Sequence, residues 1–251
     1  MFFLSDVLWA QKAGNSEEEY EDAFWPKGRV IGERRTQVSV AVADGATESS
    51  FSGVWARQLA HAYCRGILSS SNLQDSLSKK QQAWARFVGR KPLPWYAEEK
   101  VRKGAFSTVL GLTLEDQDKN GGAGVWKALA VGDSCLVQIR NETLLSSFPL
   151  SSAADFTNSP FLLGSSREAN TGIDSEVRSI TGEWQSGDKF YLMTDAIAAW
   201  FFREVEKSQA PWLALRDLET DELPFQPWVD ELRSTHQMRN DDVTLYRIEV
   251  D

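Results

Sequence analysis

The sequence is poor in the residues that build redox and zinc sites. It contains two cysteines, Cys64 and Cys135, whose spacing matches neither a zinc nor a redox motif. We therefore expect two core thiols and no disulfide framework. It also contains two histidines, His61 and His236, and neither belongs to a Ser-His-Asp or Cys-His arrangement. The nucleophile-elbow and P-loop patterns are absent as well, which argues against catalysis by a protein nucleophile.

Long apolar runs and dense basic blocks are missing too. No run approaches the roughly 20 apolar residues that span a bilayer. The stretch from Met1 to Asp6 has no basic region, and its apolar run is too short for a signal peptide. The formal net charge is -9, and the Lys and Arg residues are scattered, so the chain repels a phosphate backbone. We expect no membrane partner, no nucleic-acid partner and a cytoplasmic location.

What the sequence does have is enough apolar material for a substantial core. Its 251 residues are 42% hydrophobic, which fits one large domain or two small ones, and we take 1–251 as a single domain. Apolar residues at helical spacing predict helices over 48–68, 73–88, 94–103, 197–205, 212–218 and 228–238. Short alternating or β-branched runs predict strands over 2–12, 37–43, 106–114, 125–131, 135–139, 189–194 and 243–248.

Further predictions concern the arrangement of the elements. The strand over 2–12 is expected at a sheet edge, and 26–36 is expected to be a turn rich in Lys and Arg. The runs between 106 and 139 are typical of an antiparallel meander with a turn at Gly132-Asp133. Residues 146–187, rich in Ser, Asn and Gly, indicate a mobile or functional flap. Strands and helices in separate blocks favour an α+β fold, with sheets packed together and helices outside.

Acidic residues follow or precede several of the predicted strands. The run from Val40 to Ala43 stops at Asp44, and Gly45 lets a ligand reach the backbone carbonyl. Alone, an Asp-Gly pair after a strand is more often an ordinary turn. The other acidic strand ends are Glu21-Asp22, Gly132-Asp133-Ser134, Thr194-Asp195 and Asn240-Asp241-Asp242. Several acidic residues at strand ends along one edge of a sheet indicate a cluster of metal ligands.

The order of these motifs resembles one known family. Glu21-Asp22, Asp44-Gly45, Phe106-Ser107-Thr108, Gly132-Asp133-Ser134, Thr194-Asp195 and Asp241-Asp242-Val243-Thr244 occur in the order found in the type 2C metal-dependent protein serine/threonine phosphatases. The resemblance covers about residues 10 to 250. It implies a four-layer α-β-β-α sandwich, with two central antiparallel sheets flanked by helices. It also implies two Mn²⁺ or Mg²⁺ ions at one edge and a phosphorylated protein as the substrate.

The resemblance assigns roles residue by residue. Asp44 would bridge both metal ions, and Gly45 would donate its carbonyl oxygen to one of them. Asp195 and Asp241 would complete the ligands of the other ion, so Asp44, Asp195 and Asp241 are the predicted catalytic residues. Asp241 is preferred to Asp242 because the family pattern places the ligand two residues before the valine of the Val-Thr pair.

Three further acidic residues complete the predicted ligand set. Glu21 and Asp22 would act largely through metal-bound water. Asp133, together with Asp195, resembles a third and weaker metal site. A set made only of oxygen ligands suits Mg²⁺ or Mn²⁺. Two such ions can supply the attacking water and hold the phosphoryl oxygens, so that no protein nucleophile is needed.

The chain also departs from the family pattern. The family commonly has an arginine shortly before the Glu-Asp pair that holds the substrate phosphate, but residues 1–20 contain none, and Lys12 is the nearest candidate. A lysine offers a point charge rather than a bidentate fork. Ala46-Thr47 stands where many members have a histidine that acts as a general acid. Ala196 replaces a common glycine, and Asp242 replaces a common asparagine.

These departures leave alternative functions open. The first interpretation is a phosphatase acting on phosphoserine or phosphothreonine. The second is a phosphatase-like binding or regulatory module with little activity, in which 146–187 is the recognition loop. A third is a metal-dependent phosphatase for small phosphate esters. Substitution of Asp195 by Asn distinguishes the first two interpretations. A phosphatase would lose its activity, whereas a pure binding module would still bind its partner.

Overall fold

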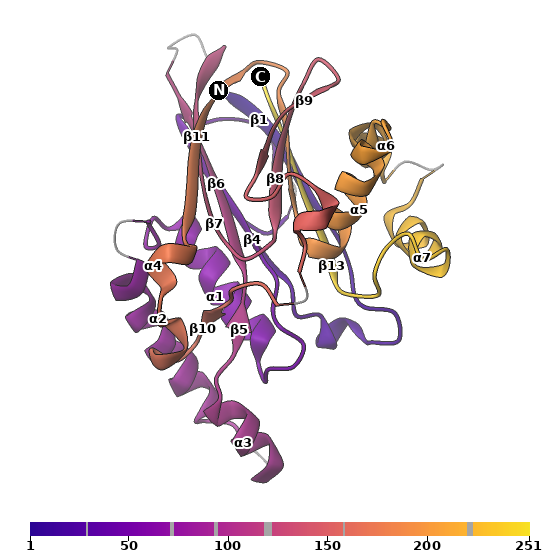
Figure 1. Cartoon of the computed structure of the whole chain (residues 1–251). Coiled ribbons are helices and arrows are strands. Elements are labelled where there is room, and N and C mark those ends of the chain that lie inside the picture. The colour runs from indigo at the N-terminus through magenta and orange to yellow at the C-terminus, as the bar shows by residue number, and fades with distance from the viewer. Residues whose placement is uncertain (29, 71–72, 93–94, 118–121, 158, 220–222) are drawn as a thin grey trace.

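In the computed structural model, two antiparallel sheets stack face to face between two groups of helices (Figure 1). The structure describes residues 1–28, 30–70, 73–92, 95–117, 122–157, 159–219 and 223–251. The arrangement is the four-layer α-β-β-α sandwich that the sequence predicts.

The first sheet has six strands in the order β3-β1-β13-β12-β8-β9. Their bounds are β1 Phe2–Ala10, β3 Val30–Arg34, β8 Cys135–Arg140, β9 Thr143–Phe148, β12 Lys189–Met193 and β13 Val243–Val250. The second sheet has five strands in the order β11-β7-β6-β4-β2. Their bounds are β2 Ala23–Trp25, β4 Gln37–Ala43, β6 Val109–Asp116, β7 Ala123–Val131 and β11 Arg178–Gln185. A separate pair joins β5 Phe106–Ser107 and β10 Leu163–Gly164.

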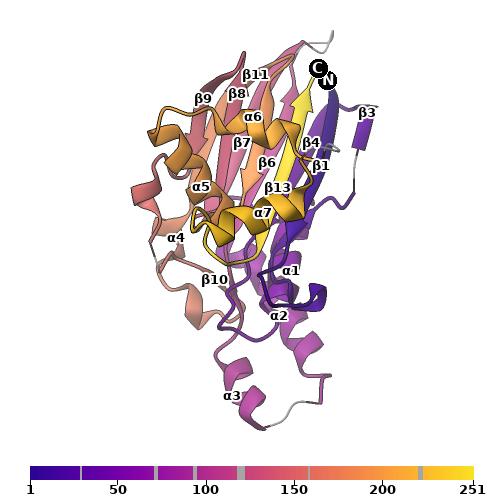
Figure 2. The same ribbon diagram turned by 90° about the vertical axis from the view of Figure 1, so that its right-hand side faces the viewer.

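The helices cover the outer faces of the two sheets. One group lies against the five-stranded sheet and consists of α1 Ser52–Cys64, α2 Leu73–Val88 and the more distant α3 Trp95–Arg102. The other lies across the six-stranded sheet, as Figure 2 shows, and consists of α5 Asp195–Glu206, α6 Pro211–Asp217 and α7 Phe225–Ser234. The short pieces are α4 Ile173–Glu176, η1 Glu17–Glu19, η2 Ala153–Asp155 and η3 Glu168–Asn170.

Three apolar clusters hold the four layers together. Between the sheets, alternate residues of the strands point inward, among them Val40, Leu112 and Leu192. A second cluster packs α1 and α2 on the five-stranded sheet around Trp55. A third packs α5, α6 and α7 on the six-stranded sheet around Phe201. Burial of one face per helix and both faces per sheet is what makes the sandwich stable.

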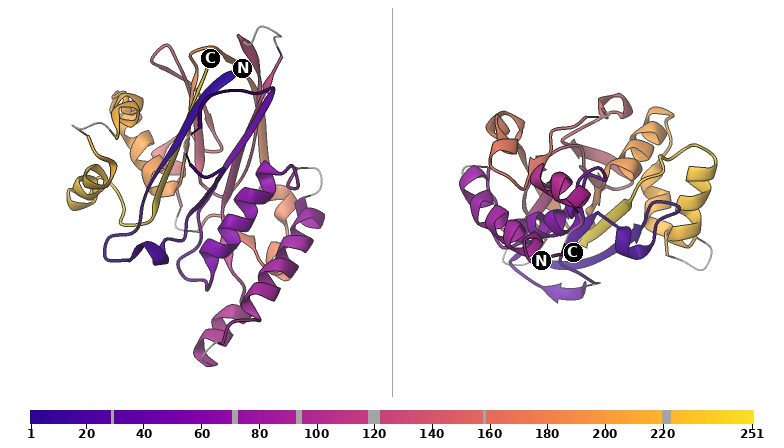
Figure 3. Two further views of the ribbon diagram at one scale, coloured as in Figure 1. Left: turned by 180° about the vertical axis from the view of Figure 1, so that it is seen from behind. Right: turned by 90° about the horizontal axis from the view of Figure 1, so that it is seen from below.

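The two ends of the chain lie side by side at one end of the sandwich (Figure 3). The backbone N–H of Phe2 donates to the carbonyl oxygen of Asp251 over 2.7 Å. In the part of the chain that the structure describes, no helix is both long enough and apolar enough to cross a membrane.

Two sequence predictions about strands are wrong. The strand at the N-terminus is not at an edge, because β1 pairs with β13 on one side and β3 on the other. The predicted turn over 26–36 contains β3. Its residues Val30 and Ile31 form too short an apolar pair, between glycines and charged residues, to be distinguished from a turn by composition.

The predicted meander is also corrected, and part of the predicted flap forms a strand. β6 pairs with β7 as expected, but β8 pairs with β12 and β9 in the other sheet. The turn at Gly132-Asp133 therefore carries the chain from one sheet to the other rather than closing a hairpin. Part of the expected flap over 146–187 belongs to a sheet, since β11 within it forms the edge strand of the five-stranded sheet beside β7. Its sequence is mostly polar because most of its side chains remain exposed.

Candidate metal centre

The predicted acidic residues all lie at the end of the sandwich that is opposite to the chain termini. The strand registers establish this: Ala10 pairs with Val243, Met193 pairs with Cys135, and Ala23 pairs with Ala43. Each of these residues is the first or last residue of its strand. The acidic residues that flank those strands, namely Asp22, Asp44, Asp133, Asp195 and Asp241, consequently meet at one edge.

Asp44 is held by hydrogen bonds with Thr108, the residue between β5 and β6. Its backbone N–H donates to Oγ1 of Thr108 over 2.9 Å, and the N–H of Thr108 donates to the Asp44 carbonyl oxygen over 2.9 Å. The hydroxyl of Thr108 lies 2.9 Å from that of Ser134, both groups being buried. The end of β4 is thereby tied to the connection between β7 and β8, which carries Asp133.

Gly45 is required by a close approach of two backbones. A Cβ atom at this position would lie 2.6 Å from the carbonyl oxygen of Glu21 and 3.0 Å from the carbonyl carbon of Ser52. Any side chain would therefore separate the segment before β2 from the turn after β4. The hydroxyl of Ser52, which is buried at the start of α1, donates to the Glu21 carboxylate.

Asp22 is almost completely enclosed at this edge. Thr244 Oγ1 donates to its Oδ2 over 2.7 Å, and the hydroxyl of Tyr20 hydrogen-bonds to Thr244 in turn. Asp22 is only 2% exposed. Burial raises the pKa of the Asp22 carboxyl well above its usual range, and the negative charge of Asp242 raises it further.

The carboxylates at this edge repel one another. Burial raises the pKa of Asp44 well above its usual range, and the charges of Asp22 and Asp195 raise it further. Asp133 and Asp241 act on Asp44 in the same direction. Burial, followed by the charge of Asp195, raises the pKa of Asp133 to about 7. Several carboxylates that are close together and shielded from water are destabilised as anions. They are stabilised either by taking up protons or by binding cations.

Several carboxylate oxygens in this cluster have no partner. Oδ1 of Asp22, Oδ1 of Asp133 and Oδ1 of Asp195 are buried and make no hydrogen bond. Buried carboxylate oxygens of this kind are the donors that Mg²⁺ and Mn²⁺ prefer, so the residues present fit such an ion. The carboxylates do not converge on one metal position in this structure. Among the described residues, no group of three or more Asp, Glu, His or Cys side chains is arranged to hold a metal ion.

Asp242 has a role that the sequence did not predict. Its carboxylate accepts hydrogen bonds from two backbone N–H groups that lie on other segments of this edge. Its Oδ1 accepts a hydrogen bond from the N–H of Lys12 over 2.8 Å, and its Oδ2 accepts one from the N–H of Glu21 over 2.7 Å. Asp242 therefore joins three segments of this edge.

Two arginines that the sequence analysis missed contact the segment before β13. Arg239 pairs with Oδ2 of Asp195 and lies 3.1 Å from Oδ2 of Asp241. Arg233, on α7, donates to the carbonyl oxygen of Asp241 over 2.7 Å. The only sequence signal for Arg239 was its place two residues before a predicted ligand. Nothing local marked Arg233, because α7 brings it to the loop.

Ala196 does not disturb the site, although the family commonly has glycine there. It lies in the first turn of α5, and its side chain is buried in the cluster between this helix and the six-stranded sheet. Asp195 is the first residue of that helix. A carboxylate at a helix N-terminus is stabilised by the helix dipole, which helps to hold a negative charge at this buried position.

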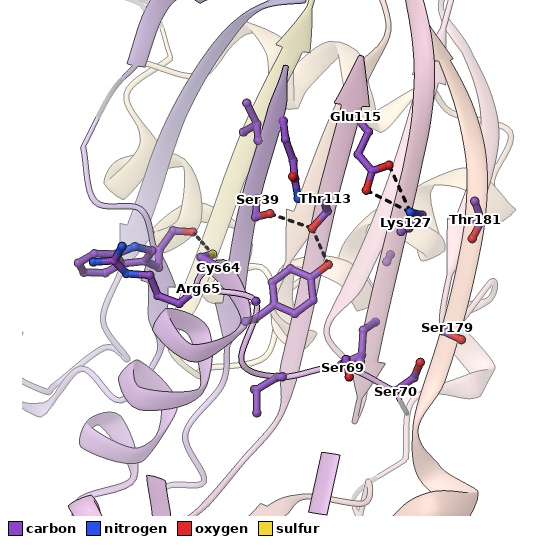
Figure 4. A pocket seen from close by; sticks show the side chains of 18 of the residues that line it. Ser39, Cys64, Arg65, Ser69, Ser70, Thr113, Glu115, Lys127, Ser179 and Thr181 are labelled. Atoms are coloured by element: carbon purple, nitrogen blue, oxygen red, sulfur yellow. Dashed lines mark hydrogen bonds and ion pairs between the residues drawn. The ribbon is translucent and has the colours of Figure 1, made fainter. Parts of the chain in front are cut away.

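A separate hollow lies over the outer face of the five-stranded sheet (Figure 4). Its volume is about 890 Å³, and it is lined from successive strands by Ser39, Thr113, Lys127 and Thr181. Ser39 and Thr113 hydrogen-bond to each other over 2.9 Å, and Lys127 pairs with Glu115 over 3.1 Å. None of the predicted metal ligands lines this hollow. The acidic edge and the hollow are therefore distinct features.

The family model described as Protein phosphatase 2C matches residues 17–244. The chain belongs to the protein phosphatase 2C family. This match confirms the resemblance inferred from the order of the motifs. It makes the chain a member of a family of metal-dependent enzymes that hydrolyse phosphoric monoesters on phosphoproteins. No curated protein matches the chain.

Solved structures of protein phosphatase 2C proteins have the same fold. The photosystem II phosphatase PBCP is 17% identical, with 99% of each chain covered and a TM-score of 0.54. The Mycobacterium tuberculosis serine/threonine phosphatase PstP/Ppp is 14% identical, with 100% of each chain covered and a TM-score of 0.55. RsbX in complex with magnesium is 16% identical, with 100% of this chain and 96% of RsbX covered and a TM-score of 0.52. Identities this low show the shared fold.

Proposed function

We propose that this protein phosphatase 2C chain hydrolyses phosphoserine and phosphothreonine in proteins, using two Mn²⁺ or Mg²⁺ ions at the acidic edge. The observation that carries the proposal is the set of unpartnered, buried carboxylate oxygens on Asp22, Asp133 and Asp195, at an edge where the strand ends meet. The structure of the PstP catalytic domain contains 2 manganese ions, and that of RsbX contains magnesium. We infer that residues 1–251 act as one domain.

Seven residues are proposed as the metal ligands, directly or through water. Asp44 would be shared by the two ions, Gly45 would offer its carbonyl oxygen to one of them, and Asp195 and Asp241 would hold the other. The remaining three are Glu21 and Asp22, which act through water, and Asp133, which contributes with Asp195 to a third and weaker site. The mutual repulsion between these carboxylates supports the assignment, because a divalent cation would relieve it.

When bound, the ions supply the attacking water and neutralise charge on the phosphoryl oxygens. The protein holds the carboxylates in place. Thr108 and Ser134 fix the end of β4, Thr244 orients Asp22, and Asp242 keeps the loop before β13 in register. Such preorganisation lets the site accept charge without rearranging during the reaction.

The substrate phosphate needs a cation at the mouth of the site, and Lys12 is the proposed residue. Its backbone N–H donates to Asp242, so its side chain begins at the acidic edge. A lysine attracts the phosphate as a point charge. The proposed partner is a phosphorylated protein in the cytoplasm. Cys64 and Cys135 are both free thiols, which supports a reducing compartment.

The deciding experiment measures phosphate release from a phosphothreonine peptide, with Mn²⁺ titrated in and a chelator as control. Wild type is compared with Asp44→Asn and with Asp75→Asn, the same substitution at an exposed position of α2. We expect metal-dependent release by wild type and by Asp75→Asn, and none by Asp44→Asn. Wild-type protein that binds Mn²⁺ and releases no phosphate from several peptides would contradict the proposal.

One observation favours a second candidate, the binding or regulatory module. The described carboxylates do not converge on one metal position, and Arg239 pairs with two of them, Asp195 and Asp241. A module of this kind would keep its partner after Asp195→Asn, whereas the phosphatase would lose its activity. Hydrolysis of phosphopeptides compared with small metabolite phosphates tests the third candidate, a phosphatase for small phosphate esters.

A further inference from the structure

The guanidinium of Arg239 lies between two carboxylates that belong to different strand ends. It pairs with Asp195, the first residue of α5 just after β12, and with Asp241, before β13, at 3.1 Å. The side chain of Arg239 is 52% exposed, whereas those of Asp195 and Asp241 are 10% and 28% exposed. The positive charge thus covers the cluster from its solvent side.

The backbone around Arg239 is held independently of this contact. Arg233 donates to the carbonyl oxygen of Asp241, and the N–H of Asp242 donates to Oδ1 of Asp241 over 3.1 Å. Asp242 in turn accepts hydrogen bonds from the segment before β2. Loss of the Arg239 side chain would therefore leave the loop in place, since none of these bonds involves it.

The charge of Arg239 is permanent and well matched to the cluster. A guanidinium does not lose its proton in proteins, and its fork of N–H groups suits carboxylate oxygens. A divalent ion bound by Asp195 and Asp241 needs the same oxygens. An arginine and a metal ion cannot both occupy them, because two cations sharing one pair of oxygens would repel each other.

We propose that Arg239 is a tethered counter-ion that competes with the metal ions for Asp195 and Asp241, and so sets the metal affinity of the centre. The inference rests on the proposed metal centre and adds to it a residue that opposes the binding of metal ions. In the absence of metal, Arg239 neutralises part of the repulsion among the carboxylates. When a metal ion binds, the guanidinium moves out toward solvent, to which about half of the Arg239 side chain is already exposed.

The size of the effect follows from competition. The apparent dissociation constant of the metal equals its intrinsic value divided by the fraction of molecules in which the carboxylates are free of Arg239. A half-exposed ion pair stabilises the contact between its two side chains only modestly, and Arg239 forms two such pairs. We therefore expect removal of the guanidinium to tighten Mn²⁺ binding by roughly three- to tenfold.

The experiment measures Mn²⁺ binding to metal-free protein by isothermal titration calorimetry, for wild type, Arg239→Gln and Arg216→Gln. Arg216 is a matched control because it pairs with Glu142 and Asp217 and lies beside Lys189, at the opposite end of β12. We expect a lower dissociation constant for Arg239→Gln and an unchanged one for Arg216→Gln. The ratio between wild type and Arg239→Gln should narrow at about 1 M salt, because screening weakens a half-exposed ion pair.

Thermal unfolding gives a second readout that a purely structural role would not produce. In chelator, Arg239→Gln should melt below wild type, because the carboxylates lose their counter-ion. With saturating Mn²⁺ the difference should shrink or reverse, since the metal then supplies the charge. A residue that merely supported the loop would lower the melting temperature in both conditions and weaken Mn²⁺ binding.

Each outcome is decisive. Equal or weaker Mn²⁺ binding by Arg239→Gln, with wild type binding normally, would overturn the counter-ion role and leave the proposed phosphatase intact. An equal gain in affinity for Arg216→Gln would also overturn it, because net charge alone would then be responsible. Failure of wild type to bind Mn²⁺ at all would overturn both proposals. Tighter binding by Arg239→Gln alone supports the inference, whatever the activity toward phosphopeptides.

Discussion

The hydroxyl of Thr244 donates a 2.7 Å hydrogen bond to Asp22, which lies 222 positions earlier in the chain. Because Thr244 is the second residue of β13 and Asp22 immediately precedes β2, this bond joins the two sheets at the acidic edge. Tyr20 hydrogen-bonds to the same hydroxyl. The orientation of one predicted ligand thus depends on the last strand of the chain.

Thr244→Val tests that bond with little change in volume. The variant leaves a buried carboxylate oxygen without its donor, so we expect a loss of about 1–3 kcal/mol in unfolding free energy. Mn²⁺ binding should also weaken, since Asp22 would no longer be held. Urea unfolding in chelator and Mn²⁺ titration measure the two effects. Thr181→Val, at an exposed position of β11, should stay within about 0.5 kcal/mol of wild type.

Gly45→Ala tests the close approach of the backbones around the predicted carbonyl ligand. The added methyl group would lie 2.6 Å from the carbonyl oxygen of Glu21, so the backbone must shift, at a cost of about 1–3 kcal/mol. We expect weaker Mn²⁺ binding together with lower stability. In Gly89→Ala the methyl group meets only the Ala85 carbonyl oxygen, at 3.2 Å, and the loss should be smaller. Normal Mn²⁺ affinity in Gly45→Ala would argue against a role for this carbonyl.

The metal-free protein should lose stability as the pH rises. Burial raises the pKa of Asp133 to about 7, above the value of about 3.9 for an unfolded aspartate. The folded state therefore binds more protons between these values, and its unfolding free energy falls as the pH rises from about 4 to about 7. Asp22 and Asp44 contribute in the same direction.

Urea unfolding in chelator from pH 5 to pH 8 measures this dependence. Asp133→Asn should reduce the slope, because it removes one of the carboxyls whose pKa is raised. Saturating Mn²⁺ should reverse the trend, since the metal binds the deprotonated ligands and its affinity increases with pH. Metal-free protein that is more stable at pH 8 than at pH 5 would contradict the burial of these groups as the cause.

Lys12→Ala tests the proposed phosphate contact. We expect the KM for a phosphothreonine peptide to increase by roughly three- to tenfold with little change in kcat, because an exposed charge contributes similarly to ground-state and transition-state binding. Steady-state kinetics in saturating Mn²⁺ provide the measurement. Lys79→Ala, at an exposed position of α2, should leave KM unchanged. An unchanged KM in Lys12→Ala would mean that another group holds the phosphate.

Much of the fold was predictable because its signals are local. The predicted helix over 73–88 corresponds to α2, and the predicted strand over 37–43 corresponds to β4. Elements with a weak pattern were missed for physical reasons. β11 is an edge strand with a largely exposed, polar surface, and β3 has only two adjacent apolar residues before Gly32. Whether β8 continues a hairpin or enters the other sheet is decided by long-range packing, which the turn at Gly132-Asp133 does not encode.

The acidic edge was likewise predictable in part from local sequence signals. Carboxylates beside strand ends can be located from sequence, because an apolar run that stops at an Asp predicts both the strand and its terminus. The arrangement of Asp22, Asp44, Asp133, Asp195 and Asp241 along one edge then follows from how the sandwich is assembled. The family match over residues 17–244 agrees with that order of motifs.

The roles of adjacent residues required the tertiary structure. Asp241 and Asp242 are chemically identical, and they differ only in what surrounds them: Asp242 accepts backbone hydrogen bonds from Lys12 and Glu21, at separations of 230 and 221 residues. Arg239 likewise contacts Asp195 across 44 residues. A hydrogen bond or ion pair of this kind depends on where the folded chain places its partner, so no local stretch of sequence contains the information that assigns it.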